Sequence, residues 1–140
     1  MVERKEFGPY VVLAKRKKIV KGGDYIDKAW SLAENNVGPI AHLLKNDGVS
    51  LSFIGFEKDG YYYAGFITDK PFSPSEHDGW FALDIEKGDC IISPIGDVYE
   101  DTVKELEDYA RDNGLVVKGN PIDYASMGEA YTLLFVNSVS

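Results

Sequence analysis

The sequence predicts an α+β fold in which the order strand–helix–strand–strand occurs twice along the chain. Three observations support this prediction. Segments with the apolar patterns of strands fill much of the 140 residues, and one amphipathic helical pattern lies in each half. Between the halves, a stretch rich in Pro, Ser and Gly at 70–79 interrupts all periodicity. We therefore expect a single domain over 1–140, a tandem β-α-β-β duplication with pseudo-repeats at about 10–69 and 80–138.

The first half begins with a strand pattern, YVVLAKRKKIV, at 10–20. A helix is expected at about 25–36, because Asp24 is a typical N-cap and apolar residues follow it at helical spacing. This apolar stripe consists of Ile26, Trp30, Ala33 and Val37. Gly38-Pro39 ends the helix and starts a short second helical piece, PIAHLLKN.

Two strands complete the first half, and the second half repeats its order. The strands VSLSFIGFE and YYYAGFITD flank Asp59-Gly60, a dipeptide typical of hairpin turns. After the 70–79 stretch, WFALDIEKGDCIISPI predicts strand, turn and strand. The segment GDVYEDTVKELEDYARDNG predicts a helix that ends at Gly114. The last strands are LVVKGNPIDYAS, with a bend at 119–121, and EAYTLLFVNSV.

The strands that end each half predict which aromatic residues share a face. Aligning their tyrosines sets Tyr131 beside Tyr62, Leu133 beside Ala64, and Phe135 beside Phe66. Because side chains alternate along a strand, these six residues would line the interior of a curved sheet. Tyr61 and Tyr63 would then face the helices or solvent.

Composition excludes several classes of function. The net charge of −8 argues against direct binding to nucleic acid, which requires a basic surface. The basic run KRKK at 15–18 is interpreted as a solvated strand edge. No apolar run approaches the length of a membrane span, no signal sequence is evident, and a single cysteine is typical of a reducing cytoplasm. We expect a cytoplasmic protein that does not bind membranes.

Catalytic and metal-binding patterns are not evident. His42, His77 and Cys90 do not have the spacing of a zinc site, and nothing places either histidine near a nucleophile. Cys90 is interpreted as a small buried apolar residue. No glycine-rich phosphate loop is present. We therefore predict no catalytic residue, no metal and no cofactor.

Three segments resemble the GyrI-like small-molecule-binding family. The segment ISPIGDVYEDTVKELEDYARDNGLVVKGNPIDYAS resembles the family's run of a strand, a helix start with Gly, Tyr and Glu, a helix ending in Asn-Gly, and a strand closing on Tyr. GDCIISPIGD resembles its approach to that helix, and YYYAGFIT its tyrosine-rich third strand. The resemblance covers nearly the whole chain. The family comprises the effector-binding domains of AraC- and MerR-type multidrug regulators and stand-alone proteins, and we expect the stand-alone form.

The resemblance implies a curved, barrel-like antiparallel sheet with two main helices against it. It also implies a pocket for bulky, often cationic or aromatic molecules. The family's pocket Glu lies in the final strand, two residues before an aromatic, and this position falls on Leu133, before Phe135. Because leucine has no carboxylate, we expect no hydrolysis and a preference for neutral aromatic ligands over cations.

The candidate ligand-binding residues are mostly aromatic, since aromatic rings supply both apolar area and cation–π contacts. They are Trp30, Tyr62, Phe66, Trp80, Tyr99, Tyr131, Leu133 and Phe135. Tyr99 is one of these candidates because it matches the tyrosine at the family's helix start. The alternative is that these residues belong to the ordinary core, and it is favoured for Trp30, Leu133 and Phe135. For Trp80, a lid over the pocket and a plug in the core both stay open.

The leading functional hypothesis is a binding module that senses or sequesters a bulky, aromatic or lipophilic small molecule. It would act on transcription only through a regulatory protein partner, because no helix-turn-helix pattern is present. The first alternative is a hydrolase of strained or electrophilic toxic compounds in the same pocket. The second is a protein-binding modulator of the gyrase-inhibitor type, with the acidic helix YEDTVKELEDYARD as its partner surface.

Overall fold

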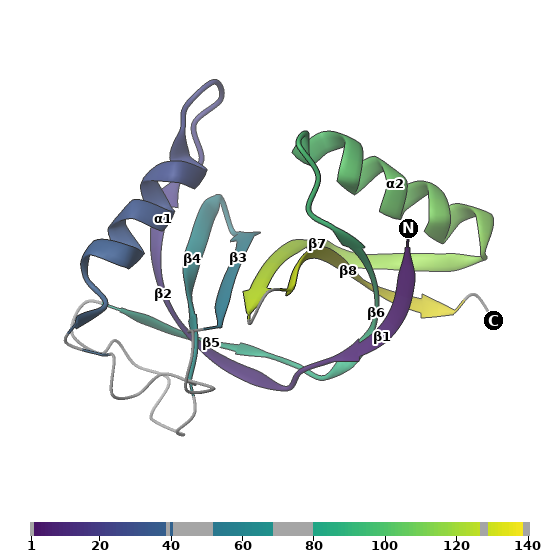
Figure 1. Ribbon diagram of the computed structural model, residues 1–140, viewed down its shortest axis with the longest axis horizontal. Helices are drawn as coiled ribbons and strands as arrows, with labels where there is room; N and C mark the ends of the chain where they lie inside the picture. The colour runs from purple at the N-terminus through teal and green to yellow at the C-terminus, as the bar shows by residue number, and fades with distance from the viewer. Residues whose placement is uncertain (1, 39, 41–51, 69–79, 127–128, 139–140) are drawn as a thin grey trace.

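The structure is a computed structural model, and it describes residues 2–38, 40, 52–68, 80–126 and 129–138. Within these residues, eight strands form one antiparallel sheet, and helices α1 (Tyr25–Asn35) and α2 (Tyr99–Asp112) pack on it. Figure 1 shows the sheet curled into a half-barrel, with both helices outside it. The strands are β1 Glu3–Phe7, β2 Tyr10–Lys18, β3 Phe53–Lys58, β4 Tyr61–Ile67, β5 Phe81–Ile85, β6 Gly88–Pro94, β7 Leu115–Ser126 and β8 Glu129–Ser138. This confirms the α+β class with a curved antiparallel sheet.

The strand order, β1-β6-β8-β7-β3-β4-β2-β5, is the same in both halves when read outward from its centre. In the first half β4 lies between β3 and β2, and in the second half β8 lies between β7 and β6. The outermost strands are exchanged, because β5 pairs with β2 and β1 pairs with β6. This order confirms the tandem β-α-β-β duplication. The expected join at 70–79 and most of the PIAHLLKN piece lie outside the described residues.

The boundaries of the helices and the bend in β7 follow the sequence closely. Asp24 occupies the N-cap position of α1, although its side chain makes no capping hydrogen bond. Gly114, with φ of 66°, follows the end of α2 in the left-handed conformation that glycine permits. The β7–β8 register shifts between Lys118 and Ile122, where the sequence predicts the bend. Strand β1 was not predicted, because all of its residues except Phe7 are exposed and mostly charged.

Each face of the sheet carries its own apolar core. The inner face of the half-barrel is filled by a cluster that includes Phe7, Val12, Ile54, Tyr63, Ile67, Tyr131 and Leu133. On the outer face, α1 covers a second cluster with Leu13, Tyr62, Ala64, Phe66 and Trp80. A third cluster beneath α2 contains Ile91, Leu106, Ala110, Leu134 and Val136. The rings of the half-barrel and the helix-covered rings are therefore separated by the sheet.

The predicted pairing of Tyr62 with Tyr131 on one face is wrong. Tyr62 faces α1, whereas Tyr131 faces the inside of the half-barrel. The counterpart of Tyr131 is Tyr63, since Tyr63 pairs with Phe56 as Tyr131 pairs with Tyr124. The tyrosine alignment was one residue out of register, and such a shift moves every side chain to the opposite face. For the same reason Phe66 lies under α1 and does not share a wall with Phe135.

Trp80 is part of the core under α1. Its exposed fraction is 1%, and its ring lies 5.8 Å from the ring of Phe66. The ammonium group of Lys15 lies 4.9 Å from the centre of the indole ring, within the range of a cation–π contact. Of the two interpretations left open by the sequence, the core plug is the one that this geometry favours.

Candidate ligand-binding cavity

A cavity of about 310 Å³ opens on the outer face of the sheet, between α1 and the start of α2. Trp30 of α1 and Phe53 of β3 line one side, and Tyr99 of α2 lines another. The floor includes Asp123 of β7 and Thr132 of β8, which are directly paired strand neighbours. The size lies at the lower end of the range of small-molecule sites.

Asp123 is the charged group that enters this cavity from the sheet. The hydroxyl of Thr132 donates a hydrogen bond of 2.9 Å to one of its carboxylate oxygens, and the hydroxyl of Tyr62 donates one of 3.2 Å to the other. Burial raises the pKa of Asp123, while these two hydrogen bonds act in the opposite direction. Within the described residues, no Lys or Arg forms an ion pair with this carboxylate.

Tyr62 reaches Asp123 because the intervening strand has a glycine at the crossing point. Gly55 of β3 pairs with Ala64 on one side and with Asp123 on the other. A Cβ atom at residue 55 would overlap the Tyr62 hydroxyl and would lie 2.7 Å from Cζ2 of Trp30. The absence of a side chain therefore lets the phenol lie across β3 toward the second half of the chain. Burial raises the pKa of Tyr62, and the negative charge of Asp123 adds to this rise.

Aromatic rings and the start of α2 complete the walls. The ring of Trp30 lies 6.1 Å from that of Phe53. Tyr99 is 40% exposed at the mouth, and burial followed by the charge of Asp123 raises its pKa. Thr102 shapes the wall before α2, because its side chain accepts a hydrogen bond from the Gly96 backbone N–H. The arrangement presents a carboxylate at the base of a cavity that has aromatic side chains in its walls, which is a suitable environment for an organic cation.

The structure brings only some of the predicted site residues together. Trp30 and Tyr99 line the cavity, and Tyr62 lies behind it as the partner of Asp123. Phe66 and Trp80 are packed under α1. Tyr131, Leu133 and Phe135 belong to the inner face of the half-barrel. The expectation of a cavity without an acid, which was based on Leu133, is therefore wrong, because the acid comes from the neighbouring strand β7.

Sequence reasoning missed Asp123 because its partners are distant along the chain. The signal was present in the strand pattern NPIDYAS, where a single acidic residue stands between Ile122 and Tyr124. Acidic residues are depleted in strands, so one at the centre of a sheet requires hydrogen-bond partners. Elsewhere in the part of the chain that the structure describes, no cluster of His, Cys, Asp and Glu is arranged to hold a metal. No helix among the described residues has the length and apolar character needed to cross a membrane.

Comparison with known proteins identifies the fold. No protein-family model and no curated protein matches the sequence. The structure is similar to the C-terminal domain of EcmrR, with a TM-score of 0.63 and 16% identity over 99% of this chain and 98% of that domain. It is also similar to a hydrolase from Listeria innocua, with a TM-score of 0.56 and 13% identity over 97% of this chain and 91% of that one.

Two further solved structures share this architecture. EcmrR in a DNA complex has a TM-score of 0.57 and 16% identity over 99% of this chain and 58% of that one. An integron cassette protein from the mobile metagenome of Vibrio cholerae has a TM-score of 0.55 and 12% identity over 97% of this chain and 95% of that one. These similarities show that the chain shares the fold of the EcmrR C-terminal domain, in agreement with the curved antiparallel sheet and two helices that the sequence resemblance implied.

Proposed function

We propose that this chain binds lipophilic organic cations in the cavity between α1 and α2 and acts as a sensor or sequestering module. The observation that carries this proposal is the carboxylate of Asp123, which lies at the base of an aromatic cavity without an ion-pair partner among the described residues. The fold shared with the C-terminal domain of EcmrR, a protein also solved in complex with DNA, supports a role in sensing.

The energetics favour a cation over a neutral ligand of the same shape. Tyr62 and Thr132 each donate one hydrogen bond to Asp123, so the carboxylate retains capacity to accept more. A positive charge about 4 Å from this group gains roughly 4 kcal/mol at the effective dielectric constant of a partly buried site. Cation–π contacts with Trp30 and Tyr99 add about 0.5–2 kcal/mol each. Desolvation of the ligand offsets part of this gain, and the net preference remains for the cation.

A matched ligand pair tests the proposal. N-methylquinolinium and quinoline have nearly the same shape and differ in permanent charge, and their affinities are measured by isothermal titration calorimetry. We expect wild type to bind the cation at least about ten-fold more tightly, and Asp123→Asn to lose this preference. Glu129→Gln removes an exposed acid at the start of β8 and serves as the control, with both affinities unchanged. Equal affinities of wild type for the two ligands contradict the proposal.

Hydrolysis of a strained or electrophilic compound is a second candidate, because a phenol and a carboxylate are hydrogen-bonded beside the cavity. A similar solved structure is described as a hydrolase, at 13% identity. In such a reaction, Asp123 would accept a proton from water as the water oxygen attacks the electrophilic carbon and a strained ring C–C bond breaks. The ring carbon that leaves would keep the electron pair of that bond and then take a proton, which gives the ring-opened alcohol. Product formation from a cyclopropane-containing electrophile, followed by chromatography, tests this candidate. It is supported if turnover is lost in Asp123→Asn and retained in Glu129→Gln, and it is abandoned if wild type shows no turnover above buffer.

A further inference from the structure

A second cavity, of about 510 Å³, lies on the opposite face of the sheet, at one end of the half-barrel. Its base consists of Phe56, Ile85, Ile122 and Phe135, which come from four different strands. Ile122 and Asp123 are consecutive residues of β7, so their side chains point to opposite faces of the sheet. The sheet therefore separates this cavity from the one between α1 and α2, and the function proposed above does not involve it.

The base of this cavity is apolar and firmly packed. Phe56 and Ile85 are each 8% exposed, and Ile122 is 6% exposed. The ring of Phe135 lies against Gly88 of β6, where a Cβ atom would come within 3.0 Å of it. Glycine at this position lets the ring lie over β6 and close one side of the base. A flat apolar group entering the cavity would therefore meet a preformed apolar surface.

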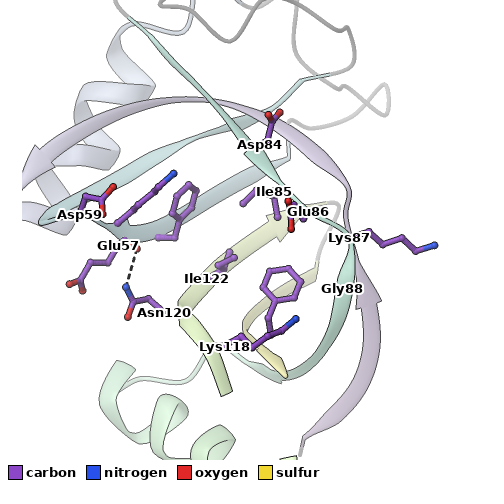
Figure 2. A pocket seen from close by; sticks show the side chains of 14 residues that line it. Glu57, Asp59, Asp84, Ile85, Glu86, Lys87, Gly88, Lys118, Asn120 and Ile122 are labelled. Carbon is purple, nitrogen blue, oxygen red and sulfur yellow. Dashed lines mark hydrogen bonds between the residues drawn. The ribbon is translucent and has the colours of Figure 1, made fainter. Parts of the chain in front are cut away.

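Two lysines lie on the same face as this base. Lys118 is directly paired with Phe135, and Lys58 is two residues after Phe56 and directly paired with Tyr61. Directly paired residues project to one face of a sheet, and Phe135, Phe56 and Tyr61 pack on the inner face. Figure 2 shows Lys118 beside the cavity. Neither lysine forms an ion pair within the described part of the chain.

The other charged groups around the cavity are directed differently. Glu57 and Asp84 are strand neighbours of the inward-facing Phe56 and Ile85, so they point outward, and Figure 2 shows this. Lys87 extends away and forms an ion pair of 3.2 Å with Glu6. Asp59 and Glu86 directly follow the last residues of β3 and β5, at the rim of the cavity. The charges that stand on the inner face of the strands themselves are therefore the two ammonium groups.

We infer that this cavity is a second ligand site, for a carboxylate attached to an apolar or aromatic body. The body covers Phe56, Ile122 and Phe135, and the carboxylate is directed toward the ammonium groups of the inner-face lysines Lys58 and Lys118. Asp59 and Glu86 repel an anion at the rim, which fixes the orientation of the ligand with its carboxylate toward the lysines. The ligand class is opposite in charge to that proposed for the Asp123 cavity.

The probes 2-naphthoate and 2-naphthamide test this inference, because they differ in charge and share the same ring system. Their affinities are measured by isothermal titration calorimetry, and their position by NMR shift changes of the Ile122 and Ile85 methyl groups. We expect wild type to bind 2-naphthoate more tightly than the amide. Lys58 and Lys118 are exposed, and the double substitution Lys58→Gln/Lys118→Gln is expected to lower the affinity for 2-naphthoate by at least about ten-fold. The affinity for the amide is expected to fall by less than about two-fold. Lys87→Gln, the control, leaves both affinities unchanged.

Two further arms separate this site from the Asp123 cavity. Asp123→Asn and saturating N-methylquinolinium are both expected to leave 2-naphthoate binding unchanged, since the sheet lies between the cavities. The inference is overturned if 2-naphthoate and 2-naphthamide bind with equal affinity. It is also overturned if either Asp123→Asn or saturating N-methylquinolinium weakens the binding of 2-naphthoate. A further contradicting result would be tighter binding of 2-naphthylmethylammonium than of 2-naphthoate in this cavity. The carboxylates of Asp59 and Glu86 would then have a larger effect on the charge of the ligand than the two lysines.

Discussion

Asp123 and Tyr62 belong to different halves of the chain, and the 3.2 Å hydrogen bond between their side chains connects those halves on the outer face of the sheet. Burial raises the pKa of Asp123, and the hydrogen bonds from Thr132 and Tyr62 limit that rise. Two hydroxyl groups therefore help to keep the carboxylate charged. We therefore expect the proposed affinity for cations to depend on these hydroxyl groups as well as on the acid itself.

Cation binding is expected to depend on pH through Asp123. The affinity for N-methylquinolinium should have its full value above the raised pKa of Asp123. It should decline as pH falls through this pKa, because the protonated carboxyl group has no charge. Calorimetric titrations from about pH 8 to about pH 4 measure this dependence. In Asp123→Asn the affinity should be low and independent of pH, and a wild-type curve without inflection contradicts the assignment.

The same carboxylate has the opposite effect on folding. Its folded pKa lies above the reference value of 3.8, so its stabilising contribution is complete below that value and is lost as pH rises through the folded pKa. Chemical denaturation of wild type and Asp123→Asn over this range should show a difference in unfolding free energy that decreases with rising pH. A difference that increases with pH would contradict burial as the dominant cause of the shift.

Tyr62→Phe removes one of the two hydrogen bonds to Asp123 and tests its contribution. We expect the pKa of Asp123 to rise further and the protein to lose about 1–3 kcal/mol of unfolding free energy, because one carboxylate oxygen loses its donor. Carbon-detected NMR of the carboxyl group measures the pKa. Tyr63→Phe is the control: its hydroxyl accepts a hydrogen bond from Arg16 on the inner face and should leave the pKa of Asp123 unchanged. Equal shifts in both variants contradict a direct role for Tyr62.

The strands and helices were predictable to different extents. The helices follow from apolar stripes, and the bend in β7 follows from its Gly-Asn-Pro sequence, since these are local properties. The relative register of β4 and β8 was not predictable from their tyrosines, because strand pairing depends on distant partners. This one-residue error placed Tyr62 on the wrong face, and Asp123 was missed because its hydrogen-bond donors come from β4 and β8.

Gly55 of β3 has no side chain, which leaves room for the Tyr62 phenol to cross the strand. The substitution Gly55→Ala tests whether this room is needed. The added methyl group would overlap the Tyr62 hydroxyl and crowd Trp30. We expect a loss of about 1–3 kcal/mol in unfolding free energy, together with weaker binding of N-methylquinolinium. Gly38→Ala is the matched control, because a Cβ atom there has no neighbour within 4 Å among the described residues. Equal stability of the two variants contradicts the proposed crossing of Tyr62 over β3.

At the scale of the whole molecule, the two halves are interlocked by exchange of their outermost strands. Strand β1 pairs with β6 of the second half, and β5 pairs with β2 of the first half. The fold class and the duplication were predictable because both depend on element order. The exchange was not, since a short, exposed strand such as β1 has little apolar signal.

This exchange predicts that neither half folds alone. Fragments 1–69 and 80–140, produced separately, are expected to lack a cooperative unfolding transition by circular dichroism, because each lacks the partner of an edge strand. Mixed in equal amounts, they are expected to regain the transition, since together they restore every strand pair. Cooperative unfolding of either isolated fragment would show that its own strands suffice.

Gly55 and Asp123 occupy equivalent positions of the duplicated halves, and they are directly paired across the centre of the sheet. If both positions carried aspartate, two carboxylates would lie side by side at the centre of the sheet. Their mutual repulsion would raise the pKa of one of them and keep it protonated. With glycine in one copy and aspartate in the other, the repeat loses its symmetry at its axis. One half donates the phenol and the other accepts it, so the duplicated fold has a single carboxylate here and is expected to bind one cation per chain.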